Sequence, residues 1–134
     1  NAGVMLTRVE YKKNDFLIAD AAMNDLLRPA LYQAHHDVWP VTKNNDAMRS
    51  NVSLVGPICE TGDFLAKNIE SESSKGDLLA VKTVGAYGFV MSSNYNSRPR
   101  AAEIIVDKDT FYLIRKREDY SSLTALEEGL DAQI

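Results

Sequence analysis

Short apolar runs, each of strand length and too short for a typical helix, recur along the chain and end at turn-forming residues. Three of them are Phe16–Ala19, Val52–Val55 and Leu78–Val84, bounded by Asn, Asp, Gly or Pro, and such runs are typical of strands buried on both faces. Residues 4–11 instead alternate with a period of two, and one face becomes polar toward its end, as in a half-buried strand. This spacing predicts a mainly β fold.

A hairpin and two short helices complete the predicted elements. The hairpin is expected to have strands at Ile104–Val106 and Phe111–Ile114 and a turn at Asp107–Thr110. One helix is expected within Asn24–Gln33, interrupted by Pro29, which leaves open whether Arg28 and Tyr32 share a helical face. The second helix is expected after Ser121, with three leucines on one face that we expect to pack in the core: Leu123, Leu126 and Leu130.

The size and charge of the chain limit the classes of function. Its 134 residues are one domain's worth, and 45% hydrophobic with 25% charged residues is an ordinary globular composition. With 15 basic and 19 acidic residues the net charge is −4, and the basic clusters lie beside carboxylates, which argues against nucleic-acid binding. No apolar run approaches the length that crosses a bilayer.

The single cysteine, Cys59, follows a Gly-Pro turn at the end of an apolar run and precedes the carboxylate of Glu60. One cysteine cannot form an internal disulfide, which favours a reducing, cytoplasmic setting. At a turn the thiol can reach the surface and exchange a proton, although a lone cysteine often packs as a small hydrophobe. The position alone leaves both interpretations open.

Four segments together resemble the diaminopimelate decarboxylases, a family of pyridoxal-phosphate enzymes that form lysine. They occur in the family's order and near its spacing: Asn24-Asp25-Leu26-Leu27-Arg28-Pro29-Ala30-Leu31-Tyr32, Gly56-Pro57-Ile58-Cys59-Glu60-Thr61-Gly62-Asp63, Gly85-Ala86-Tyr87-Gly88-Phe89 and Met91-Ser92-Ser93-Asn94-Tyr95-Asn96-Ser97-Arg98-Pro99-Arg100. The resemblance runs from Asn1 to about Leu130. A lone Cys-Glu pair can arise by chance, whereas four segments in register are specific.

The resemblance implies that residues 1–134 are the single C-terminal β domain of a longer decarboxylase. In the family this domain is a Greek-key-type β-barrel or sandwich with one or two short helices, within the alanine racemase-like fold. The chain begins without methionine and enters a strand almost at once, which also indicates a piece of a longer polypeptide. The cofactor, pyridoxal 5′-phosphate, would be held mainly by an N-terminal α/β barrel, because no segment here matches the Schiff-base lysine or the phosphate loop. The chain alone is therefore expected to be inactive.

The resemblance implies roles for five residues. Cys59 would protonate the substrate carbon in the active site of the partner subunit, and Glu60 would bind the substrate's distal ammonium group. Arg28, helped by Tyr32, would grip the distal carboxylate, and Tyr87 would contact both the cofactor and the substrate. Without the family, the same residues are compatible with an exposed loop glutamate, a solvated arginine and tyrosines that fill the core.

The resemblance further implies a cytoplasmic homodimer with shared active sites and a small amino-acid substrate, meso-diaminopimelate, with no metal, nucleic-acid or membrane partner. Related enzymes of this fold act on ornithine, arginine or carboxynorspermidine, and the ornithine enzymes carry aspartate where Glu60 stands. Thr61 departs from the family's usual serine but keeps the hydroxyl. An alternative of another class is a catalytically silent binding or dimerisation module. Adjacent His35 and His36 are expected to be polar surface residues and not metal ligands or the base of a cysteine hydrolase.

Overall fold

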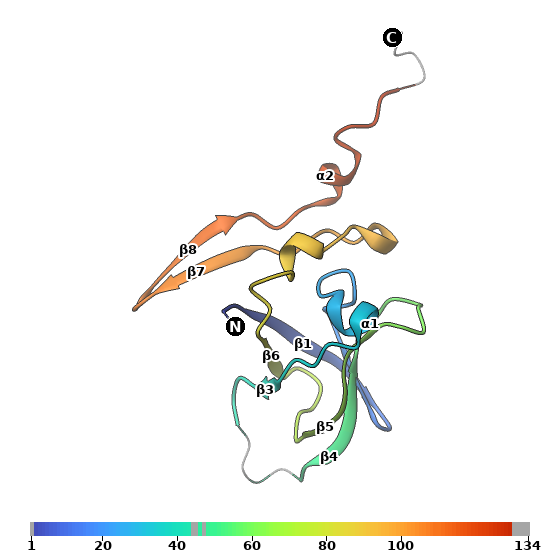
Figure 1. Ribbon diagram of the computed structural model, residues 1–134, viewed down its shortest axis with the longest axis vertical. Coiled ribbons are helices and arrows are strands. Elements are labelled where there is room, and N and C mark those ends of the chain that lie inside the picture. The colour runs from blue at the N-terminus through green and yellow to red at the C-terminus, as the bar shows by residue number, and fades with distance from the viewer. Residues whose placement is uncertain (1, 44–45, 47, 130–134) are drawn as a thin grey trace. The chain divides into compact units, whose positions relative to one another are not determined.

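The computed structural model describes residues 2–43, 46 and 48–129, which form two compact units that divide between Ser92 and Ser93. The first unit contains a six-stranded sheet (Figure 1). All of the predicted site residues lie in this unit, in α1 (Arg28–Tyr32) and in loops. In sheet order its strands are β3 (Val38–Pro40), β6 (Leu78–Lys82), β1 (Val4–Lys13), β2 (Phe16–Ala19), β4 (Ser50–Val55) and β5 (Phe64–Ser71). The edge strands β3 and β5 approach each other, so the sheet curls into a nearly closed barrel. The prediction of a mainly β fold is confirmed.

Strand β1 lies in the middle of this sheet and pairs with β6 on one side and β2 on the other. Met5 lies opposite Val81 and Val9 lies opposite Ala19, both in antiparallel register. The register with β2 shifts after Val9, and a bulge of this kind bends a strand and increases its twist. Strands β2 and β4 run parallel, whereas β4 and β5 form an antiparallel pair.

The core fills the inner face of the curled sheet. Its cluster of buried residues is Val9, Leu17, Ala19, Ala21, Leu26, Val52, Leu54, Leu65, Leu79 and Val81. Burial alternates along β2, β4 and β6, so that Leu17 is fully buried while its neighbour Phe16 is 42% exposed. The prediction that these strands are buried on both faces is therefore wrong. A single sheet that curls around one core packs only its inner face.

Helix α1 (Arg28–Tyr32) is shorter than the predicted helical segment Asn24–Gln33. Pro29 lies in its first turn, where its missing N–H group is not needed, so proline begins this helix and does not interrupt it. Gln33 ends the helix in the left-handed conformation with φ of 54°, and its backbone N–H donates to the Arg28 carbonyl. After β6, the chain continues through a loop into a 3-10 turn, η1 (Phe89–Met91).

The second unit contains the predicted hairpin, formed by β7 (Glu103–Asp107) and β8 (Thr110–Arg115), together with η2 (Tyr95–Ser97) and helix α2 (Tyr120–Thr124). A capping box between Asp119 and Ser122 begins α2. Leu126 is 95% exposed, so the prediction that the leucine face packs in the core is wrong there, and Leu130 lies outside the described residues. No helix in the described part of the chain is long and apolar enough to span a membrane.

Glu118 holds two segments of the second unit together. Its carboxylate accepts hydrogen bonds from the Arg100 backbone N–H at 2.8 Å and the Asn94 side-chain amide at 2.7 Å. The Arg100 guanidinium donates a third bond at 2.8 Å. The Arg100 backbone bond, followed by the Asn94 and Arg100 side chains, lowers the pKa of Glu118 to about 2.

Candidate active site

Arg28 and Tyr32 share one face of α1. They are four residues apart on the helix, and the Arg28 Cζ lies 5.9 Å from the centroid of the Tyr32 ring. Pro29 therefore does not separate the two residues, because helical geometry begins at Arg28 itself. The predicted pair of residues can face a common ligand.

Tyr87 reaches the same guanidinium from the loop that follows β6. Its ring centroid lies 5.5 Å from the Arg28 Cζ, within cation–π distance. Tyr87 has a φ of 59°, and a left-handed conformation of a bulky residue is uncommon outside turns and functional sites. Gly88 follows it, and a Cβ at Gly88 would collide with the Val84 carbonyl. The tight turn therefore requires glycine next to Tyr87 and presents the tyrosine ring to Arg28.

The charge of Arg28 has no counterion in the part of the chain that the structure describes. Its guanidinium makes no salt bridge there and lies within cation–π distance of the rings of Tyr32 and Tyr87. Tyr32 and Tyr87 are 61% and 57% exposed, respectively, so the three side chains form an open, positively charged corner. A guanidinium that keeps its N–H donors available binds a carboxylate or a phosphate with both oxygens.

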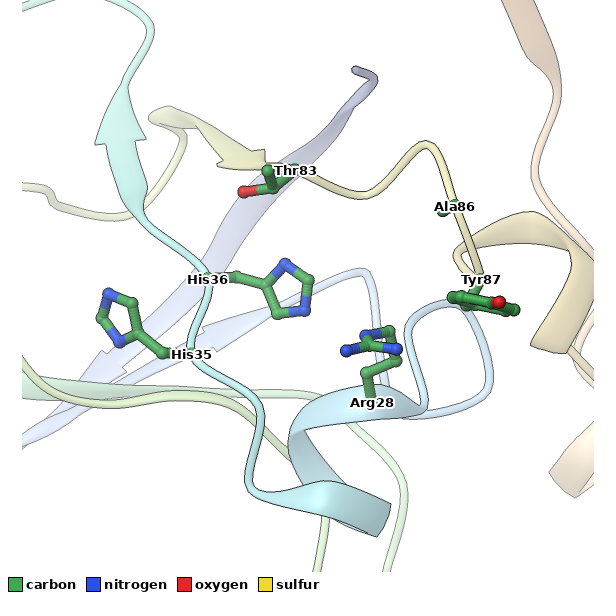
Figure 2. Close-up of a pocket in the computed structure, with 6 residues that line it drawn as sticks. All are labelled: Arg28, His35, His36, Thr83, Ala86 and Tyr87. Atoms are coloured by element: carbon green, nitrogen blue, oxygen red, sulfur yellow. The ribbon is translucent and has the colours of Figure 1, made fainter. Parts of the chain in front are cut away.

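An open pocket of about 330 Å³ lies beside this corner. It is lined by Arg28, His35, His36, Thr83, Ala86 and Tyr87, which come from α1, the segment before β3 and the loop after β6 (Figure 2). Arg28 and Tyr87 are predicted site residues, whereas no pattern in the sequence predicts that the histidine segment joins them. The antiparallel pairing of β3 with β6 brings these two segments together.

The two histidines differ in their surroundings. The His35 side chain is 81% exposed and lies 3.1 Å from the Asp37 carboxylate. His36 is only 4% exposed, and its Nδ1 lies 2.9 Å from the Lys82 carbonyl. The prediction that both are surface residues is therefore wrong for His36, because the β3–β6 pairing covers it.

Cys59 and Glu60 lie on the loop between β4 and β5, and both are exposed. The alternative that Cys59 packs as a buried small hydrophobe is thus wrong. Ile58, directly before it, is 6% exposed and anchors the loop in the core. The loop therefore turns the cysteine and the glutamate outward together.

Asp63 fixes the shape of this loop and was not among the predicted site residues. It is 4% exposed, and its carboxylate accepts backbone N–H bonds from Ile58 at 2.8 Å and from Met23 at 2.7 Å. Its own backbone also closes the loop on Gly56 and Glu60. A signal was present in the sequence, since an aspartate before an apolar strand and after a glycine is a common turn residue.

Gly56 allows the cysteine loop to approach the segment that leads to α1. A Cβ at Gly56 would lie 2.6 Å from Ala22 and still closer to the Asp63 carboxylate. The Asp63 bond to Met23 and this close approach tie the two loops into one structure. Cys59 and Glu60 nevertheless do not line the pocket beside Arg28. The predicted residues thus form two groups, one around Arg28 and one on the cysteine loop.

The chain is similar to one family of known proteins. The sequence model of the "Pyridoxal-dependent decarboxylase, C-terminal sheet domain" matches residues 1–85. The diaminopimelate decarboxylase of Pseudomonas aeruginosa is 60% identical over 97% of this chain, which corresponds to 32% of that protein. The diaminopimelate decarboxylase of Vibrio cholerae is 54% identical over the same 97%, again 32% of its length. The chain thus spans about a third of the length of the curated relatives that it matches.

Solved structures have the same fold. The crystal structure of diaminopimelate decarboxylase from Helicobacter pylori complexed with L-lysine superposes with a TM-score of 0.85 and 42% sequence identity. The superposition covers 92% of this chain and 31% of the Helicobacter pylori chain.

Proposed function

The chain belongs to the pyridoxal-dependent decarboxylases, whose C-terminal sheet domain it contains, and from this premise we propose that the whole protein converts meso-2,6-diaminopimelate into L-lysine and carbon dioxide. The proposal rests on the surroundings of Arg28. Its guanidinium has no counterion among the described residues and lies against two tyrosine rings beside an open pocket. Relatives with 60% and 54% identity carry the name diaminopimelate decarboxylase, which supports the choice of substrate.

In this proposal Arg28 selects a substrate with a carboxylate at its far end. The guanidinium binds both carboxylate oxygens, and the Tyr32 hydroxyl, on the same face of α1, adds a further donor. Glu60 supplies the opposite charge for the ammonium group at that end. A substrate with an amino-acid group at each end satisfies both residues, whereas ornithine has no carboxylate for Arg28.

Cys59 is the proposed proton donor. Pyridoxal phosphate, when bound, withdraws electrons from the substrate so that carbon dioxide can leave. The Cys59 Sγ then gives its proton to the substrate carbon that has lost carbon dioxide, and solvent returns a proton to the thiolate. Its exposed position on the β4–β5 loop supports this role, because the thiol must reach a carbon outside its own domain.

The residues that line the described pocket can supply only part of a binding site for pyridoxal phosphate. A pyridoxal-phosphate site needs a lysine for the aldehyde and an acid beside the ring nitrogen. Neither residue type lines the described pocket, where Tyr87 offers an aromatic ring and a hydroxyl. We therefore propose that Tyr87 contacts the cofactor and that an N-terminal α/β barrel of the whole protein provides its main binding residues. The chain would then be the single C-terminal β domain of that protein.

We further propose a cytoplasmic homodimer with shared active sites. Cys59 and Glu60 lie apart from the Arg28 pocket, which supports the idea that they act in the site of the partner subunit. Each protomer would use its own Arg28, Tyr32 and Tyr87 and receive Cys59 and Glu60 from its partner.

The decisive experiment measures carbon dioxide release from meso-diaminopimelate by the whole protein, with ornithine and arginine as comparison substrates. Replacement of Cys59 by Ala should lower kcat by about 10²–10⁴-fold, the usual contribution of a positioned general acid, and leave bound pyridoxal phosphate unchanged. Replacement of Arg28 by Lys should raise KM for diaminopimelate, with Arg117→Lys at an exposed position as the matched control. Release from ornithine or arginine alone, or no release at all, would contradict the proposal.

A further inference from the structure

His36 is locked in one orientation by the backbone of β6. Its Nδ1 lies 2.9 Å from the Lys82 carbonyl, which can only accept a hydrogen bond, so Nδ1 carries a proton. In the neutral imidazole the lone pair then lies on Nε2. The β3–β6 pairing therefore fixes which nitrogen of His36 can accept a hydrogen bond.

This acceptor is buried and has no hydrogen-bond partner among the described residues. His36 is 4% exposed, and its Nε2 is one of two buried side-chain nitrogen or oxygen atoms in the described part of the chain that lack a hydrogen-bond partner. Buried polar atoms in native proteins are nearly always satisfied, and each exception calls for an explanation. The second such atom, Ser73 Oγ, does not line the pocket.

Arg28 is a charged donor that lines the same pocket as His36. Figure 2 shows the His36 ring with one nitrogen directed toward the Thr83 segment and the other toward the side of the pocket where Arg28 lies. The Arg28 guanidinium has five N–H donors, and its contacts with Tyr32 and Tyr87 are made through the rings. A carboxylate bound by two parallel bonds uses two of these donors and leaves the others available.

We propose that His36 is a positioning residue for Arg28. In the conformation that binds a carboxylate, one Arg28 N–H donates to His36 Nε2, and this bond fixes the plane of the guanidinium in front of the ligand. No proton is transferred, and His36 does not touch the reacting atoms. The inference rests on the carboxylate-binding role of Arg28 in the proposed function.

Two variants of the holoenzyme separate this role from a purely structural one. His36→Asn keeps a donor near the position of Nδ1 for the Lys82 carbonyl but removes the acceptor at Nε2. His36→Gln places an amide oxygen near the position of Nε2. We expect His36→Asn to weaken L-lysine binding and raise KM for diaminopimelate by about tenfold, the usual effect of one lost hydrogen bond to a charged group, with kcat nearly unchanged. His36→Gln should restore most of the affinity.

A double-mutant cycle with Arg28→Lys tests whether His36 acts through Arg28. If it does, His36→Asn should change binding less than twofold in the Arg28→Lys background. A tenfold loss in both backgrounds, or equal losses for the Asn and Gln variants, would overturn the inference. If the ligand ammonium group instead bonded directly to His36 Nε2, His36→Asn would cause the same tenfold loss in both backgrounds. The cycle therefore distinguishes this alternative from an effect through Arg28.

A second measurement keeps His36 unchanged and uses acetate in place of diaminopimelate. In the holoenzyme labelled with ¹⁵N-histidine, we expect acetate to shift the Nε2 resonance of His36 in the wild type and not in Arg28→Lys. If this shift occurs while diaminopimelate is neither bound nor decarboxylated, the proposed function fails and the His36–Arg28 contact stands. If diaminopimelate is decarboxylated but acetate leaves Nε2 unchanged, the inference fails and the proposed function stands.

Discussion

Replacement of Asp63 by Asn tests whether one buried carboxylate holds the cysteine loop in place. Each Asp63 oxygen accepts a different backbone N–H, from Ile58 at 2.8 Å and from Met23 at 2.7 Å. The asparagine side chain is nearly the same size but has only one oxygen, so its amide nitrogen must face one of these two donors. The change therefore removes a hydrogen bond without creating a cavity.

The magnitude follows from these two contacts. A hydrogen bond to a charged group contributes about 1.5–3 kcal/mol, and a buried N–H left without an acceptor adds about 1–3 kcal/mol. A local loss of about 3 kcal/mol corresponds to roughly 10²-fold easier opening, since about 1.4 kcal/mol is a factor of ten. Both loops should be affected, because Asp63 bonds to each of them.

Hydrogen exchange measured by mass spectrometry on the whole protein provides the assay. We expect amide exchange in residues 21–27 and 56–63 of Asp63→Asn to be faster by about 10²-fold. Asp15→Asn, at an exposed carboxylate in the β1–β2 turn, is the matched control and should leave both segments unchanged. Unchanged exchange in both segments of Asp63→Asn would refute the reasoning, and so would an equal effect of Asp15→Asn.

Three further predictions concern packing and titration. Gly56→Ala should destabilise the protein by about 1–3 kcal/mol through overpacking, whereas Gly62→Ala, whose new Cβ meets open space, should leave the melting temperature nearly unchanged; equal shifts would contradict this. Leu17→Ala should cost about 2–5 kcal/mol in denaturant unfolding, because Leu17 is fully buried, and a cost near zero would show that the site is not core. The pKa of Glu118 is lowered from 4.5 to about 2, so its bonds to Arg100 stabilise the second unit above pH 4.5 and are lost as the pH falls through about 2; a carboxyl ¹³C titration with a midpoint near 4.5 would disprove this.

Most of the strands were predictable because they leave a local pattern in the sequence, whereas β3 (Val38–Pro40) and β5 (Phe64–Ser71) were not predicted. The strands at Phe16–Ala19 and Ile104–Val106 were located from short apolar runs and the turn residues around them. The number of buried faces was not predictable, because it depends on what packs against the sheet. A continuous apolar run has the same sequence pattern whether the outer face of its strand is covered by another layer or exposed to solvent.

The site was predictable only in part, and the reason is again the difference between local and distant information. The resemblance pointed to Arg28 and Tyr87, and the structure brings them together. His36 looked like a surface residue because its burial depends on the β3–β6 pairing, which links segments more than forty residues apart. Asp63 looked like an ordinary turn residue because its partner Met23 lies forty residues earlier in the chain.

The central place of β1 in the sheet has a consequence for how the domain is made during protein synthesis. Met5 pairs with Val81, so β1 cannot acquire its β6 neighbour until the ribosome has released residue 81. Protein synthesis adds about 5–20 residues per second, so the edge of β1 that pairs with β6 stays unpaired for several seconds. Conditions that slow elongation between the two strands should therefore lengthen the period in which the nascent chain depends on chaperones.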